Sequence, residues 1–316
     1  MKRKTVTKIT TAAAAGAMLA TSVAAPVNMA MAANFIKSVI NALQTLMSDD
    51  QVAVLLGVFT GIAGSLMTIY LFMDLLDKAS KDMVTLEKLI TTFIKWFVAM
   101  VILIYLQDLL VAMFKVAMGM YSMLANSSVK STQQMGIQYF PGVNPDPSKW
   151  PAYNVVKESF EGAGYKNSAS AVAKKISVFI GALIPMAAMY IGKIAAFLMA
   201  AGNAVIVVVR TIFAPVGIVQ MFDEGQRSAG VRYLKKFFAE ALTFAVILGI
   251  LFAASKLQSA LMVNILSGKP FEGKLTVDNM DSVLGIKHCV PIIVIQLAAT
   301  GGIFKANQIA NDIVGV

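Results

Sequence analysis

Residues 52–73, VAVLLGVFTGIAGSLMTIYLFM, form a run of 22 positions without a charged side chain. A helix of that length reaches about 33 Å, which is enough to cross a hydrocarbon core of about 30 Å. This run therefore predicts a membrane span. Gly57 and Gly61 lie within it at the GxxxG spacing that lets a second helix pack closely, so they are candidate helix-packing positions.

The whole chain shares this apolar character. Of its 316 residues, 58% are hydrophobic and 14% are charged, which excludes a large soluble catalytic domain. The composition predicts an all-α, polytopic membrane protein. A single histidine, His288, and a single cysteine, Cys289, are too few for a multi-ligand zinc site or an internal disulfide. We expect no metal, no cofactor, no catalytic residue and no enzyme activity.

Further apolar stretches bring the number of predicted spans to about five. The additional spans are residues 96–114, 176–209, 237–255 and 290–304. The stretch 176–209 is longer than a membrane is thick. Because no cluster of turn residues interrupts it, one protruding helix, kinked at Pro185 if at all, is favoured over two joined spans.

Polar segments separate these spans. Residues 33–50 predict an external amphipathic helix, and 74–95 predict an interfacial one. Four prolines within 139–151 indicate a loop. The predicted order is a signal peptide over 1–32, two spans with the interfacial helix in 51–126, an extracytoplasmic loop over 127–175, and three spans in 176–316. The last region includes a basic cytoplasmic loop over 210–236 and an external loop over 256–287.

The N-terminus has the features of a signal peptide. Four of the first eight residues are basic, an acid-free Ala-rich stretch follows, and Ala30-Met31-Ala32 matches a cleavage site. An uncleaved signal anchor is the alternative. Cleavage would leave the N-terminus outside and, after five spans, the C-terminus in the cytoplasm. The basic residues of the 210–236 loop would then be cytoplasmic, as the positive-inside rule expects. They are Arg210, Arg227, Arg232, Lys235 and Lys236.

Several polar side chains are predicted inside the membrane. They are Asp108, Lys193, Asn203, Glu240 and Gln296. A charge at membrane depth costs about 2.5 to 3.5 kcal/mol on insertion scales, so such groups are usually paired or face water. They either line a translocation path or hold the helices together, and both interpretations stay open. Lys193 and Glu240 are predicted at the same depth and are the candidate ion pair.

The order of these features resembles the TrbL-type polytopic channel subunit of conjugative type IV secretion systems. The resemblance covers residues 52–316 and includes the segments 213–217 and 228–238. The terminal segment 304–315 is similar to members from Gram-positive mobile elements. The resemblance implies a channel component of the bacterial cytoplasmic membrane, without ATPase activity. It also implies an oligomer that works with other secretion subunits and ATPases, contacts membrane lipids and transiently contacts transferred DNA or protein.

Two other classes remain as alternatives. A secondary transporter or another multi-span permease would also carry polar residues at the midplane, although no inverted repeat is evident. A pore-forming or holin-like protein fits the apolar composition but not the long predicted external loop.

The predicted orientation can be tested by cysteine labelling. In a Cys289→Ala background, an impermeant thiol reagent should modify Ser148→Cys on intact cells and spare Ser228→Cys. The first position is predicted outside and the second in the cytoplasm. The opposite pattern would overturn the five-span arrangement.

Overall fold

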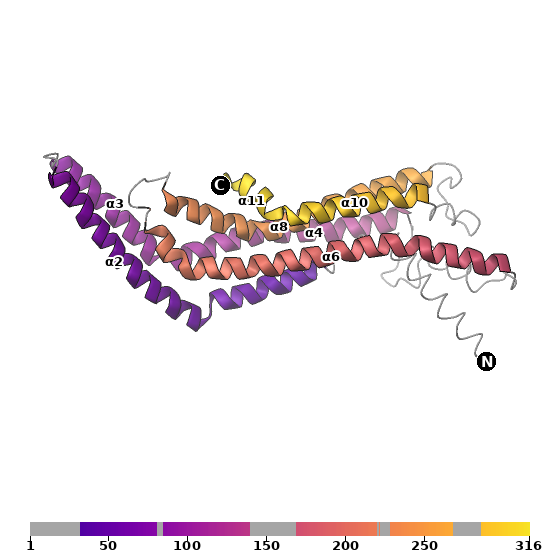
Figure 1. Ribbon diagram of the computed structural model, residues 1–316, viewed down its shortest axis with the longest axis horizontal. Coiled ribbons are helices and arrows are strands. Elements are labelled where there is room, and N and C mark those ends of the chain that lie inside the picture. The colour runs from indigo at the N-terminus through magenta and orange to yellow at the C-terminus, as the bar shows by residue number, and fades with distance from the viewer. Residues whose placement is uncertain (1–31, 81–84, 140–168, 220, 222–227, 268–285) are drawn as a thin grey trace. The chain divides into compact units, whose positions relative to one another are not determined.

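The computed structural model describes residues 32–80, 85–139, 169–219, 221, 228–267 and 286–316 (Figure 1). These residues form helices and no strand, as the all-α prediction requires. The helices are 32–47, α2 (Asp50–Ser80), α3 (Leu86–Ile104), α4 (Leu106–Tyr139), α6 (Ala169–Ile218), α8 (Ala229–Ser267), α10 (Ile286–Phe304) and α11 (Ala306–Val314). The predicted signal peptide, apart from its last residue, lies outside the described residues.

The chain divides into two compact units, which we describe separately. The first takes its described residues from 32–35, Met123–Leu198 and Ile247–Phe304. The second comprises Ile36–Ser122, Met199–Val246 and Lys305–Val316.

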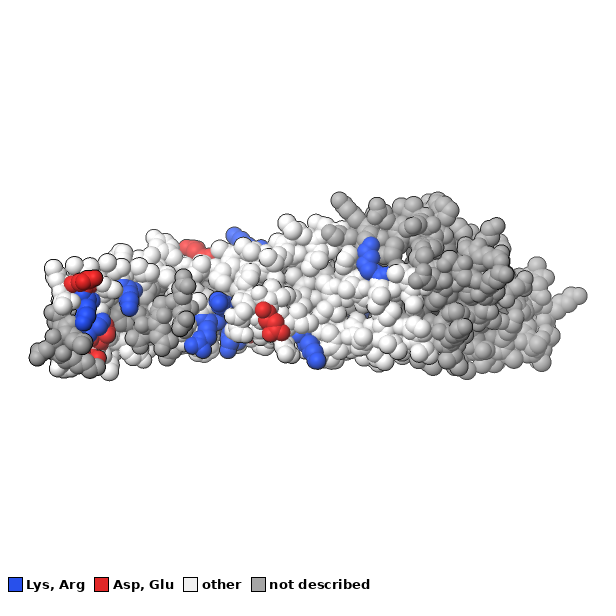
Figure 2. Space-filling view, turned by 90° about the horizontal axis from the view of Figure 1, so that it is seen from above, with Lys and Arg blue, Asp and Glu red and all other residues white. Residues whose placement is uncertain are grey.

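The protein is a multi-pass membrane protein. Four of the described helices contain a segment long and apolar enough to cross a membrane: Asp50–Ser80, Leu106–Asn126, Tyr190–Ile218 and Ala229–Gln258. Much of the described surface carries neither basic nor acidic side chains (Figure 2). In the most apolar 18-residue stretch of α2, only 22% is buried within the protein, whereas 61% of the corresponding stretch of α8 is buried. The apolar side chains of α2 are therefore largely available to lipid or to another chain.

The first helix confirms the amphipathic prediction for 33–50. Ile36, Ile40, Leu43 and Met47 recur at helical spacing, and all four are buried. Polar side chains within α2 satisfy their hydrogen bonds in their own helix. Thr60 Oγ1, for example, donates to the carbonyl oxygen of Leu56 at 2.7 Å, which removes the cost of placing a hydroxyl in lipid.

The stretch 74–95, predicted as one interfacial helix, is not a single helix. Its first part is the end of α2 and its last part is the start of α3, which packs back against α2. Lys78 of α2 donates both to Asp74 and to Thr92 of α3, each at 2.5 Å. Further along, Gly64 of α2 lies against Met100 of α3, which makes the two helices an antiparallel pair.

The predicted second span over 96–114 has different bounds in the structure, because a break divides that stretch and the candidate span is Leu106–Asn126. Tyr105 has φ −93° and ψ 15°, ends α3, and is followed directly by α4. Hydrogen bonding continues through the break, since Tyr105 N donates to Val101 O at 3.1 Å and Leu109 N to Tyr105 O at 3.0 Å. Asp108 consequently lies exposed in the first turn of α4, where a negative charge suits the helix dipole.

The stretch 176–209 forms one continuous helix, as predicted, but this helix and its neighbours extend further than expected. α6 begins at Ala169 and ends at Ile218, α4 continues to Tyr139, and α8 covers Ala229–Ser267. The predicted loops were therefore too long: 127–175, 210–236 and 256–287 all contain helical residues. Polar and basic side chains do not by themselves end a helix.

The predicted fifth span, 290–304, lies in α10, a helix of 19 residues that contains Pro291. Among the described residues, Ile293–Phe304 is an apolar helix shorter than the four candidate spans. Lys305, with φ −94° and ψ 3°, separates α10 from α11, and Gly315 at φ 73° ends α11 by donating to Asn311 O at 2.9 Å.

Ser228 has a structural role that changes the choice of labelling positions. Its side chain is 0% exposed and accepts a hydrogen bond from Val231 N at 3.2 Å, which caps the start of α8. A cysteine there would escape reagent on either side of the membrane. Lys235, which is exposed on the same helix, is the better reporter position.

Two glycines allow close approaches in the second unit, one between α6 and α8 and one between α8 and the segment that follows α6. A Cβ atom on Gly217 would lie 2.6 Å from Cδ2 of Tyr233. A Cβ atom on Gly230 would lie 2.9 Å from the Cβ of Met221. Neither distance is compatible with van der Waals packing, so both positions require a residue without a side chain.

We expect Gly217→Ala to destabilise the protein although alanine favours helix. Over-packing against Tyr233 should cost about 1 to 3 kcal/mol, more than the helix-propensity gain of about 1 kcal/mol. Gly202→Ala, in the same helix with nothing within 4 Å, is the matched control and should stabilise. Thermal unfolding in detergent measures both, and a Gly217→Ala variant as stable as Gly202→Ala would contradict the close approach.

Candidate functional site

Positions at which α6 and α8 contact one another recur at seven-residue intervals along both helices. On α6 these positions are Asn203, Arg210 and Gly217, and on α8 they are Tyr233 and Glu240. Seven residues are about two helical turns, so each series lies along one face of its helix. Gly217 meets Tyr233, and Arg210 meets Glu240 two turns further along, as an antiparallel pair of helices requires.

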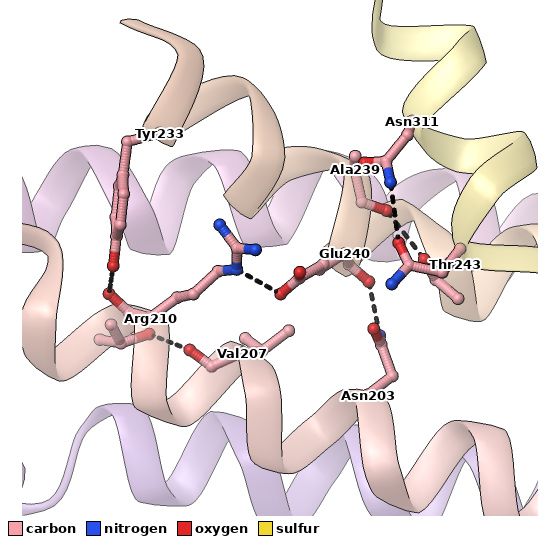
Figure 3. A network of polar contacts seen from close by, with 10 residues as sticks. Asn203, Val207, Arg210, Tyr233, Ala239, Glu240, Thr243 and Asn311 are labelled. Carbon is pink, nitrogen blue, oxygen red and sulfur yellow. Dashed lines mark hydrogen bonds and ion pairs between the residues drawn. The ribbon is translucent and has the colours of Figure 1, made fainter. Parts of the chain in front are cut away.

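An ion pair between Arg210 and Glu240 is the centre of this site (Figure 3). Arg210 Nε and Glu240 Oε2 lie 2.8 Å apart, with the side chains 25% and 5% exposed respectively. Neither atom has a well-directed hydrogen bond among the described residues, so the attraction is mainly between the charges. Both residues lie in candidate membrane spans. Removal of one partner would leave the other uncompensated in a medium of low dielectric constant.

The neighbouring polar side chains bond to backbone carbonyls. Asn203 Nδ2 donates to Glu240 O at 2.6 Å, and Tyr233 Oη donates to Arg210 O at 2.7 Å. Each bond joins a side chain of one helix to the backbone of the other (Figure 3). They therefore fix the relative positions of α6 and α8 along their axes.

The predicted ion pair between Lys193 and Glu240 is wrong. Glu240 pairs with Arg210. The Nζ atom of Lys193 lies 4.6 Å from the ring centroid of Tyr190, one turn away on its own helix. Arg210 was missed as the partner because the predicted span ended at Val209, which left the first arginine in a loop. The seven-residue spacing of Asn203 and Arg210 was the signal that could have identified it.

Gln296 takes part in a second polar contact, which belongs to the first unit. Its Nε2 donates to Gln258 Oε1 at 2.8 Å and so joins α10 to α8. Thr300 Oγ1 donates to Gln296 O at 2.8 Å and lies 3.1 Å from where a Cβ on Gly192 would be. Gln258 was not predicted, because its position had been assigned to a loop. These amide contacts connect helices.

The remaining predicted positions lie on α2 and around the start of α8. A Cβ atom added to Gly57 or Gly61 would have no described atom within 4 Å, so no described helix packs on this GxxxG face. Lys235 and Lys236 are exposed near the start of α8, as is Arg232. Arg227 lies outside the described residues.

Potential metal-binding side chains do not cluster among the described residues. No group of three or more His, Cys, Asp or Glu side chains in that part of the chain could hold a metal ion. Comparison of the chain with family models, curated proteins and solved structures gives no match.

The assigned partner of Glu240 can be tested by charge substitution. Arg210→Ala and Glu240→Ala should each destabilise the protein by roughly 3 to 5 kcal/mol, since each leaves a buried charge unpaired. The double exchange Arg210→Glu with Glu240→Arg should recover part of that loss. Thermal unfolding of the purified variants and their accumulation in membranes are the measurements.

Lys193→Ala is the control that separates the two possible pairs. It removes a positive charge from the same helix without touching Glu240, so its effect should be much smaller. A Lys193→Ala variant as unstable as Glu240→Ala, together with a neutral Arg210→Ala, would refute the assignment.

Proposed function

We propose that this protein is an integral membrane subunit of the translocation channel of a conjugative type IV secretion system, of the TrbL type. The observation that carries the proposal is the combination of an all-α multi-pass fold with extensive uncovered apolar helix surface. The order of apolar and basic segments in the sequence supports the same family. The proposed role is structural, without enzyme activity of its own.

The uncovered surface favours a subunit that works in an assembly. Large apolar side chains are exposed along α2 and α3, including Val58 and Phe72 of α2 and Phe97 of α3. Lipid can cover such a surface, and so can neighbouring subunits. An oligomer that contacts other membrane subunits and ATPases of the system, with transferred DNA or protein as transient cargo, fits this surface.

The proposed location is the bacterial cytoplasmic membrane. A cleaved signal peptide over 1–32 would leave the N-terminus outside, and the basic residues at the start of α8 would lie in the cytoplasm. The proposed C-terminus is cytoplasmic. This placement requires α10 to cross the membrane as a fifth span, and labelling of Lys235→Cys together with a C-terminal tag tests it.

A secondary transporter is the second candidate, favoured by one observation. The Arg210–Glu240 pair is a charged site between two membrane helices, the kind of position at which transporters bind substrate or coupling ions. The neighbouring genes discriminate the two candidates, since conjugation ATPase and coupling-protein genes beside this gene support the channel.

Deletion of the gene tests the proposed function directly. Conjugative transfer of the element should fall to background, while relaxase nicking of the DNA should continue, because nicking precedes passage through the membrane. Restoring the gene in trans should restore transfer. Unchanged transfer in the deletion strain would reject the channel assignment.

A further inference from the structure

The short helix α11 lies beside α8 at the level of the Arg210–Glu240 pair. Figure 3 shows α11 next to the turn of α8 that carries Ala239, Glu240 and Thr243, with the amide of Asn311 directed toward that turn, and Figure 1 also places the two helices side by side. Both segments belong to the second unit. Ala239 and Thr243, one turn apart on α8, are 0% exposed. α11 therefore covers a side of α8 that adjoins the ion pair.

The inner face of α11 consists of small and polar side chains. Ala306 and Ala310 lie one turn apart and are 0% exposed, and Asn307 and Asn311 beside them are half-buried. The amide hydrogen bond of this face, from Asn311 Nδ2 to Asn307 Oδ1 at 3.4 Å, stays within the helix. Alanine side chains allow a close approach but bury little apolar area, so this face by itself holds α11 only weakly.

The outer face of α11 has an apolar edge and a polar edge. Ile309, Ile313 and Val316 are 37%, 64% and 39% exposed, and Gln308 and Asp312 are exposed beside them. Such a division is typical of a helix that lies at the surface of a membrane, with its apolar edge in the lipid. The neighbouring turn of α8 belongs to a candidate membrane span, which brings the isoleucines of α11 within reach of lipid.

A single residue connects α11 to α10. Lys305 has φ −94° and ψ 3°, lies between the two helices, and is exposed. Ile309 N donates to Lys305 O at 2.9 Å, so the first turn of α11 is complete. A residue at the end of a helix is the kind of position that absorbs the dihedral changes of a hinge. α11 can therefore turn as one piece.

We propose that α11 is a lid that turns about Lys305 and closes the side of α8 next to the Arg210–Glu240 pair against water, with Ile309 and Ile313 held in the lipid. When the lid is open, water reaches this side of α8. Because the attraction between two charges falls as the local dielectric constant rises, the ion pair is weaker in the open state. The inference rests on the ion pair between α6 and α8 and does not depend on the function proposed above.

The rate of cysteine modification measures how often the lid is open. Thr243→Cys is the reporter and Ala241→Cys is the matched control, each in the full-length Cys289→Ala protein. Both positions are 0% exposed, but they lie two residues apart and so on opposite sides of α8. The protein is placed in lipid nanodiscs, N-ethylmaleimide is added, and the modified fraction is followed by mass spectrometry.

Two variants of α11 open the lid by different means. Ile309→Ser/Ile313→Ser removes the apolar contact with lipid, and Ala310→Leu adds volume to the buried inner face. Gln308→Ala/Asp312→Ala is the matched control, since it changes two exposed side chains on the polar edge of the same helix.

The reporter should react slowly while α11 has its natural sequence. In Ile309→Ser/Ile313→Ser it should react about tenfold faster for each isoleucine replaced, so about 100-fold in total, because each side chain loses its apolar contact and modification follows the fraction of open molecules. Ala310→Leu should also accelerate the reaction. The control position on α8 and the control variant of α11 should show no change.

Four results would overturn the proposal. Fast reaction of Thr243→Cys with natural α11 would show that this side of α8 is not closed. An unchanged rate in both test variants would show that α11 does not control access. Equal acceleration at Ala241→Cys would indicate general loosening of the unit instead of a lid. Acceleration by Ala310→Leu alone would show that lipid does not hold the lid.

Discussion

Two opposite charges buried between α6 and α8 constrain the packing of both helices. Because an unpaired charge at membrane depth is costly, Arg210 and Glu240 have to remain at the same level. That requirement sets the register of the two helices. Two turns away, the same register brings Gly217 against the ring of Tyr233, where no side chain would fit. The hydrogen bond from Tyr233 to the carbonyl of Arg210 then links the close approach to the ion pair.

Polar groups elsewhere in the protein also find partners within the chain, through hydrogen bonds rather than an ion pair. Hydroxyl groups such as that of Thr60 bond to a carbonyl of their own helix and so need no partner from another. The amides of Gln258 and Gln296 bond to each other between α8 and α10. Since the membrane interior offers no water, these groups take their partners from the chain, and each contact between helices also fixes their alignment.

The helices differ in how much of their apolar surface is left uncovered by the rest of the chain. Most of the apolar stretch of α8 is buried within the protein, whereas most of the apolar stretch of α2 is not buried. A helix with little internal burial gains its stability in the membrane from lipid or from other chains. The face of α2 that carries Gly57 and Gly61 is uncovered, since no described atom would lie within 4 Å of a Cβ at either position. The chain by itself therefore leaves much helix surface for its surroundings.

The sequence by itself determined the all-α membrane architecture, the amphipathic first helix and the continuity of α6. These are local properties, since the length of an apolar run and the spacing of Ile36, Ile40 and Leu43 depend only on nearby residues. Only the tertiary structure decided where spans end and which charges meet. The helix break at Tyr105 lies in an apolar run that contains no residue that usually breaks a helix. Arg210 was assigned to a loop because it is the first charged residue after an apolar run. Its pairing with Glu240 depends on the register between two helices, which no local pattern fixes.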